Sequence, residues 1–141
     1  MIVADTNLIA YLFISGERTE AARRVWEKDP DWRMPPLWRS EFLSVLTTAV
    51  RSGVLSEAQA IETWHNAVGA LGRMEYSPSG EKILKAAFKY DISAYDAQFV
   101  AVAQDLGARL VTGDKRILKN CVKTAVSIEI FCGVDPIANA R

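Results

Sequence analysis

Apolar residues along this chain fall into two patterns: short continuous runs, and longer stretches in which they recur every three to four positions. Most of the continuous runs are bounded by charged or turn-forming residues, which is typical of strands buried on both faces of a sheet. Five segments are therefore expected to form strands: residues 1–4, 32–34, 73–76, 109–112 and 125–131.

The stretches of helical periodicity lie between these runs and carry start and stop signals. They predict helices over residues 7–15, 19–29, 38–52, 56–71, 81–90, 93–106 and 115–120. Ser56 with Gln59, and Ser93 with Asp96, have the spacing of a helix N-terminal cap, and Gly107 favours a helix end. Helices that alternate with apolar strands indicate an α/β fold with a parallel sheet covered on both faces.

Composition and length limit the class of protein. The chain has 141 residues, of which half are hydrophobic and 24% are charged, as expected for one folded domain. We place that domain at residues 1–134, with a C-terminal tail at 135–141. The apolar runs are too short for a membrane span, and Met1 is followed too closely by Asp5 for a signal peptide, so a cytoplasmic protein is expected. Cys121, Cys132 and the single His65 lack zinc-site spacing.

Four carboxylates occupy positions where α/β proteins place their chemistry. Asp5 and Asp114 follow expected strands, and ligands of open α/β sheets bind at the carboxyl ends of strands. Asp96 and Glu41 fall in the first turns of helices, whose positive dipole end favours an anion. Taken singly, each acid has a structural alternative: Asp5 and Asp114 as helix caps, Asp96 in a capping box, and Glu41 as an ordinary helix acid.

Several carboxylates in one pocket repel one another unless a cation joins them. An oxygen-only donor set favours Mg²⁺ or Mn²⁺, which commonly share a site with substrate phosphate. The chain has 17 basic and 17 acidic residues, so outside the four candidate acids the basic residues are in excess. Two basic groups stand out as phosphate contacts or, alternatively, as solvated helix faces: Lys82, Lys85 and Lys89, and Lys115, Arg116, Lys119 and Lys123.

Three segments of the sequence resemble the PIN-domain ribonucleases, and most closely the VapC-type toxins of toxin–antitoxin pairs. They read IVADTNLIAYL, PPLWRSEFLSVL and SAYDAQFVAVAQDLGARLVTGDKRIL. The resemblance implies a three-layer α/β/α sandwich around a mostly parallel sheet of about five strands. It also implies an endoribonuclease that hydrolyses RNA with Mg²⁺ or Mn²⁺ and an activated water, forms a homodimer, and is silenced by an antitoxin protein.

The same resemblance assigns roles to individual residues. Asp5, Asp96 and Asp114 would be metal ligands, and Glu41 would complete the catalytic set. Thr6, Asn7 and Thr112 would support these acids. The basic cluster after Asp114 independently suggests Lys115, Arg116 and Lys119 as contacts to the substrate. Some family members carry a further acid shortly after the position of Asp114, where this chain has Lys115 and Arg116. One firmly bound ion is therefore expected, and a second ion that binds together with substrate remains open.

Two other functions remain open at this point. One is a catalytically inactive PIN-like module that binds RNA or protein, although all four acids are present. The other is a magnesium-dependent phosphohydrolase of small molecules that works through a covalent aspartyl intermediate. Such enzymes usually have a second acid two residues after the first, and here that position is Asn7.

Overall fold

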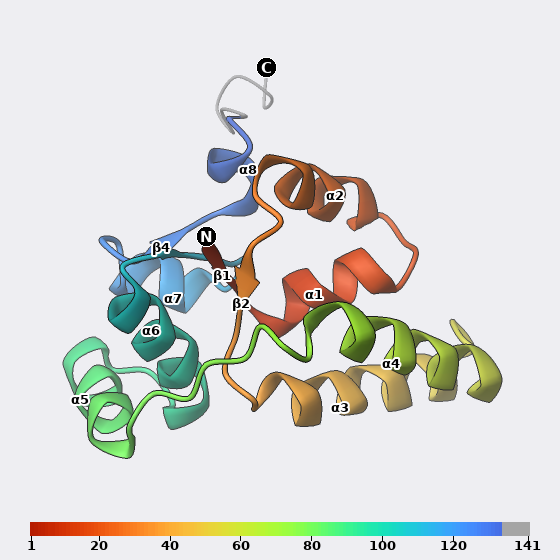
Figure 1. Ribbon diagram of the computed structural model, residues 1–141, viewed down its shortest axis with the longest axis horizontal. Helices are drawn as coiled ribbons and strands as arrows, with labels where there is room; N and C mark the ends of the chain where they lie inside the picture. The colour runs from red at the N-terminus through yellow and green to blue at the C-terminus, as the bar shows by residue number, and fades with distance from the viewer. Residues whose placement is uncertain (134–141) are drawn as a thin grey trace.

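A four-stranded parallel sheet forms the centre of the molecule (Figure 1). The computed structural model describes residues 1–133. The strands are β1 (Ile2–Ala4), β2 (Trp32–Arg33), β3 (Arg109–Val111) and β4 (Ala125–Val126), in the order β2-β1-β3-β4. Since β1 has β2 on one side and the later strand β3 on the other, the strand order reverses at β1. The carboxyl ends of β1 and β3, which precede Asp5 and Thr112, therefore lie side by side at this switch point.

Eight helices in the described residues cover the sheet. They are α1 (Thr6–Phe13), α2 (Thr19–Lys28), α3 (Trp38–Arg51), α4 (Glu57–Leu71), α5 (Gly80–Tyr90), α6 (Ala94–Leu106), α7 (Lys115–Asn120) and α8 (Ile128–Phe131). Figure 1 shows α1, α3 and α4 on one side of the strands and α5 and α6 on the other, with α6 packed on β1 and β3. The expected α/β/α sandwich with a parallel sheet is confirmed.

The helix boundaries follow the capping signals of the sequence. The hydroxyl of Ser56 accepts from the backbone N–H of Gln59 while the Gln59 side chain accepts from Ser56, which completes a capping box. The Ser93 hydroxyl caps α6 by accepting from the Asp96 N–H. Gly107 ends the same helix with a φ of +62°, a conformation that costs glycine least.

Two expected strands differ in the structure. Residues 73–76 contribute only one bridge, between Met34 and Glu75, so the described sheet has four strands rather than five. The segment 125–131 is a strand only as far as Val126, because the Ser127 hydroxyl accepts from the Ile130 N–H and starts α8. The expected tail at 135–141, and the domain end at 134, lie outside the described residues.

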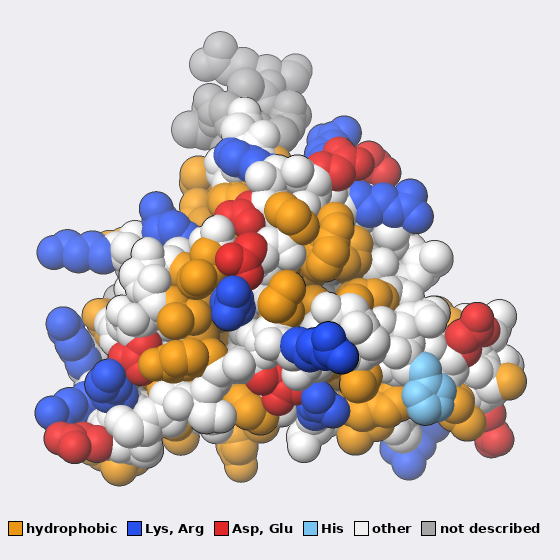
Figure 2. Space-filling view, viewed as in Figure 1, with side chains coloured by type: hydrophobic (Ala, Val, Ile, Leu, Met, Phe, Trp, Pro, Cys, Tyr) orange, Lys and Arg blue, Asp and Glu red, His pale blue; other side chains and the backbone are white. Residues whose placement is uncertain are grey.

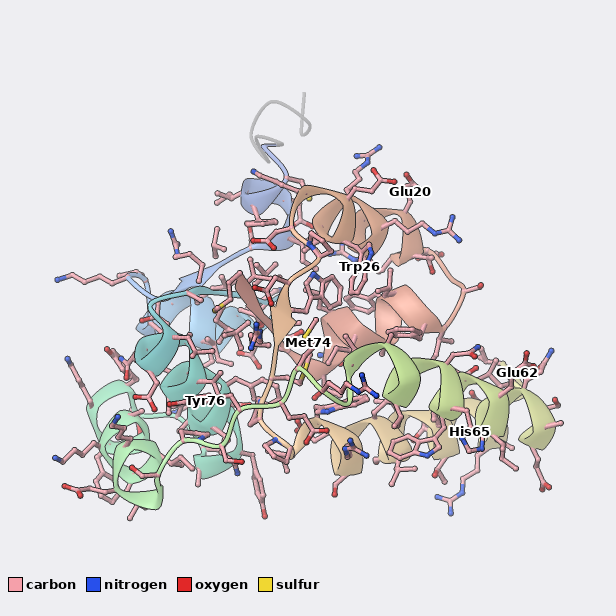
Figure 3. All side chains as sticks on the ribbon, in the orientation of Figure 1. Glu20, Trp26, Glu62, His65, Met74 and Tyr76 are labelled. Atoms are coloured by element: carbon pink, nitrogen blue, oxygen red, sulfur yellow. The ribbon has the colours of Figure 1, made fainter. Side chains whose placement is uncertain are left out.

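Aromatic side chains fill much of the core on the side of α1 to α4. Trp32 and Trp38 are fully buried, and the ring of Trp26 meets that of Trp32 edge-on at 5.1 Å (Figure 3). Trp64 of α4 stacks on Trp38 and Phe42 of α3, with ring centroids 6.2 and 6.4 Å apart, and the rings of Trp38 and Phe42 are tilted to each other at 5.8 Å. Trp38 and Trp64 therefore hold α3 and α4 together. None of the helices in residues 1–133 combines the length and apolar character needed to cross a membrane.

Candidate active site

Six of the residues singled out in the sequence line a single cavity of about 260 Å³. The cavity opens where the carboxyl ends of β1 and β3 meet the first turns of α1, α3, α6 and α7. These six residues are Asp5, Thr6, Asn7, Glu41, Asp96 and Asp114. Four carboxylates from four separate parts of the chain are thus brought to one place.

Asp5 occupies the deepest position in this group, and only 8% of its surface is exposed. It follows β1 directly and caps α1, since its Oδ1 accepts from the Leu8 N–H at 2.8 Å. Its Oδ2 accepts from the hydroxyl of Thr112. Asp5 is therefore both the N-cap of α1, as the sequence allowed, and part of the cavity wall.

Thr112 connects two of the four acids, although it does not line the cavity itself. It is completely buried just after β3. Its hydroxyl donates to Asp5 and accepts from the backbone N–H of Asp114 at 3.0 Å. One hydroxyl group therefore fixes the orientation of the Asp5 carboxylate and the turn that carries Asp114.

The other acids are also held by local contacts. Asp114 caps α7 through a hydrogen bond from the Ile117 N–H to its Oδ1 at 2.9 Å. Glu41 accepts from the hydroxyl of Thr6, with 2.8 Å between Oγ1 and Oε1. A capping bond uses only part of the acceptor capacity of a carboxylate, which leaves lone pairs for another ligand.

Burial and mutual repulsion raise the pKa values of three of these acids. Burial raises the pKa of Asp5 to about 6, with smaller increases from the charges of Asp114 and Glu41, while the hydrogen bonds from Thr112 and Leu8 act in the opposite direction. Burial also raises the pKa of Glu41, with a contribution from Asp96. The pKa of Asp96 is raised by burial and by Asp114, against the lowering effects of Ser93 and Arg116.

The donor set suits a hard divalent cation. Within residues 1–133 none of the four acids forms a salt bridge with Lys or Arg, so their charges lack a direct partner from the described chain. No three Asp, Glu, His or Cys side chains of that range form a ready metal-binding group. Mg²⁺ does not need such a group, because it commonly binds one or two carboxylates and keeps several waters. His65 projects from α4 and does not line the cavity (Figure 3).

The predicted substrate-contacting residues lie beside the cavity rather than in its wall. Lys115 and Lys119 are exposed on α7. Arg116 is also exposed and pairs with Asp91, with 3.1 Å between the guanidinium and the carboxylate. These three residues therefore lie on the helix that Asp114 caps, and none of them lines the cavity.

Four further residues of the cavity wall were not predicted from the sequence: Ser44, Val45, Phe99 and Ile117. Three of them follow a candidate acid by three positions in a helix, since Ser44 follows Glu41, Phe99 follows Asp96 and Ile117 follows Asp114. Residues three apart share a helix face. The residue three positions after each helical acid could therefore have been predicted to line the cavity, which gives these three residues but not Val45.

The pH dependence of stability offers a test of the buried carboxyl. Because the pKa of Asp5 is about 6 in the folded protein against an ordinary 3.8, the folded state holds this proton more tightly. The bound proton contributes its full stabilisation below the ordinary pKa, and this stabilisation is lost as the pH rises through 6. The free energy of unfolding should therefore fall by about 3 kcal/mol over this range. Urea unfolding in EDTA across this range should show the loss in wild type relative to Asp5→Asn. Parallel pH profiles for the two proteins would contradict it.

Comparisons with known proteins identify the family and the fold of this chain. The family model described as PIN domain matches residues 2–123. Ribonuclease VapC3 of Pyrobaculum aerophilum is 29% identical over 119 residues, which covers 82% of this chain and 91% of that protein. The crystal structure of PAE2754 from Pyrobaculum aerophilum superposes with a TM-score of 0.74 at 20% identity, over 99% of this chain and 96% of that one. At that identity the structural match concerns the fold alone.

Proposed function

Since this chain belongs to the PIN domain family, we propose that it is an endoribonuclease that hydrolyses RNA with Mg²⁺ or Mn²⁺ as its cofactor. The observation that carries the proposal is the convergence of Asp5, Glu41, Asp96 and Asp114 on one cavity at the switch point of the sheet. The similarity to a protein named Ribonuclease VapC3 supports RNA as the substrate.

The contacts of the side chains support the following roles. Asp5, Asp96 and Asp114 would hold the cation, which when bound supplies charge stabilisation at the scissile phosphate and a more acidic water. Thr112 keeps the Asp5 carboxylate in one orientation. Glu41, whose carboxylate accepts from the Thr6 hydroxyl, would align the attacking water and accept its proton. Asn7 lines the mouth of the cavity as a polar contact.

The proposal includes partners. We infer that the protein is the toxin of a toxin–antitoxin pair, acts on RNA in the cytoplasm as a homodimer, and is silenced by a cognate antitoxin protein. The name of the relative, Ribonuclease VapC3, and its similarity over most of both chains support the toxin role and the antitoxin partner. In cells, production of this protein alone should arrest growth, and co-production of the antitoxin should relieve the arrest.

Cleavage of an RNA pool by the purified full chain tests the proposal. We expect discrete fragments that require Mg²⁺ or Mn²⁺, disappear in EDTA and are lost in Asp96→Asn, because one cavity carboxylate is then neutral. Glu62→Gln is the matched control, since Glu62 is exposed on α4, away from the cavity (Figure 3).

Other outcomes would point elsewhere. If the folded wild type binds RNA without cutting it in either metal, a binding module is the better description. If it instead hydrolyses a chromogenic phosphate monoester, and Glu41→Gln retains that activity, the protein is a small-molecule phosphohydrolase.

A further inference from the structure

A second polar groove, of about 250 Å³, lies between α5 and α6. Three lysines from successive turns of α5 line it, Lys82, Lys85 and Lys89, together with Tyr90 and Gln104. Asp105 is the one acid among the lining residues. Figure 2 shows Lys and Arg side chains gathered over α5, at the lower left of the view. The groove is therefore shaped and charged to accept an anion.

Helix α7 joins this groove to the acidic cavity. It begins at Asp114 in the cavity wall, and its other end is fastened to α5 by the Asn120 side chain, which donates to the carbonyl of Tyr90 at 2.9 Å. Arg116 adds hydrogen bonds to the carbonyl and the carboxylate of Asp91, both at 3.1 Å. The exposed lysines of α7 are thus held between the cavity and the end of α5.

Most of the lysines of this groove and of α7 are available to bind a ligand. Lys82 is bound to Asp105 at 2.7 Å, and Lys85 pairs with Glu81 at 2.9 Å. The second pair is exposed on both sides, and such pairs contribute little and exchange readily. Within residues 1–133, Lys89, Lys115 and Lys119 form no salt bridge.

We propose that a basic face formed by Lys85, Lys89, Lys115 and Lys119 binds the phosphate backbone of the RNA on one side of the scissile bond. The proposal rests on the proposed function and adds how the substrate is held. A cavity of four carboxylates repels a polyanion, so affinity for RNA needs cations outside it. The face supplies them on two joined helices, since Lys85 and Lys89 lie about 6 Å apart along the axis of α5, and Arg116 and Asn120 fasten α7, which carries Lys115 and Lys119, to the end of α5.

Binding measured without cleavage tests this proposal. The probe is a fluorescein-labelled single-stranded RNA of mixed sequence and roughly 15 nucleotides, a length typical of single-strand binding sites, titrated with the full chain in EDTA. The test variant is Lys85→Gln, Lys89→Gln and Lys119→Gln combined. Its matched control is Arg23→Gln, Arg24→Gln and Arg51→Gln, which removes the same charge from exposed positions on α2 and α3. Circular dichroism of both variants is the check that they are folded.

We expect the test variant to bind about 30-fold more weakly, because each lysine that neutralises a phosphate contributes about 3-fold at moderate salt. The slope of log affinity against log salt should also fall by about 0.7 for each phosphate that the variant no longer neutralises. In Mg²⁺ the same variant should cut the probe with a raised KM and a nearly unchanged kcat, because the lysines hold substrate without touching the reacting atoms.

Three results would overturn the proposal. If wild type cuts RNA in Mg²⁺ while test and control variants bind alike, the basic face is wrong and the proposed function stands. If the test variant loses kcat at unchanged affinity, the lysines act on the cavity rather than on the RNA backbone. If wild type neither binds nor cuts the probe or the RNA pool, the face and the function fall together.

Discussion

Asp5→Asn is expected to reduce RNA cleavage by at least about 100-fold, while making the metal-free protein more stable. Residues that only support a metal ligand cost about 10- to 100-fold when replaced, so a ligand itself should cost no less. Asparagine is nearly the same shape as aspartate and is a good N-cap, so its amide oxygen can still accept from the Leu8 N–H. The loss would therefore come from the missing charge and not from a disturbed helix.

The gain in stability has an electrostatic cause. Burial raises the pKa of Asp5 to about 6, so at neutral pH the folded protein holds a carboxylate in a place that disfavours charge. Removing that charge should raise the free energy of unfolding at neutral pH by up to about 3 kcal/mol. Urea unfolding in EDTA measures this change, and the RNA assay in Mg²⁺ measures the loss of cleavage.

Mg²⁺ provides the internal control for this prediction. Addition of Mg²⁺ should raise the Tm of wild type, since an ion that binds only the folded state stabilises it. It should leave the Tm of Asp5→Asn nearly unchanged. A variant that keeps its activity would show that Asp5 serves mainly as the cap of α1, and one that is less stable than wild type in EDTA would show that the contacts of the carboxylate outweigh the cost of burying its charge.

The sequence predicts helices better than strands in this protein, for a physical reason. Helix ends depend on contacts within four residues, so Ser56, Ser93 and Gly107 mark them directly. The strands are only two or three residues long and are stabilised by partners far along the chain. Their order, and the reduction of residues 73–76 to a single bridge, follow from packing that no local pattern records.

The segment after β4 shows how two local signals compete. Val126, Ile128 and Ile130 are β-branched and favour a strand. Ser127 stands three residues before Ile130, the same spacing by which Ser93 caps α6, and in the structure the cap prevails. If Ser127 had been interpreted as a helix N-cap in the same way as Ser93, α8 would have been predicted.

Asp5 and Asp114 could be named from sequence because parallel strands bring their carboxyl ends to one edge, whereas Asp96 was indicated by its place in the first turn of a helix and Glu41 joined the set through the resemblance to the PIN-domain ribonucleases. The support from Thr112 to both Asp5 and Asp114 could not be derived in the same way. It depends on the pairing of β1 with β3, which sets Ala4 opposite Val111 and so places the residues that follow them together. Register across the sheet, rather than the type of side chain, gives this threonine its role.

Thr112→Val isolates that role, because valine keeps the shape of threonine and removes only the hydroxyl. The Asp5 carboxylate then loses a buried donor, and the Asp114 N–H loses its acceptor. We expect the free energy of unfolding to fall by about 1–3 kcal/mol, the usual cost of leaving buried polar groups unpaired. The pKa of Asp5 should rise further, since the hydrogen bond from Thr112 is one of the contacts that lower it.

The functional consequence of Thr112→Val should appear in the metal requirement. With Asp5 less firmly oriented and less acidic, the Mg²⁺ concentration for half-maximal cleavage should increase by about 10- to 100-fold. Thr112→Ser restores the hydroxyl and should recover most of the Mg²⁺ affinity, even if the lost methyl group lowers stability. Equal Mg²⁺ requirements for the valine variant and wild type would mean that the threonine serves the fold alone, whereas rescue by serine would tie the register of β1 and β3 to the chemistry of the site.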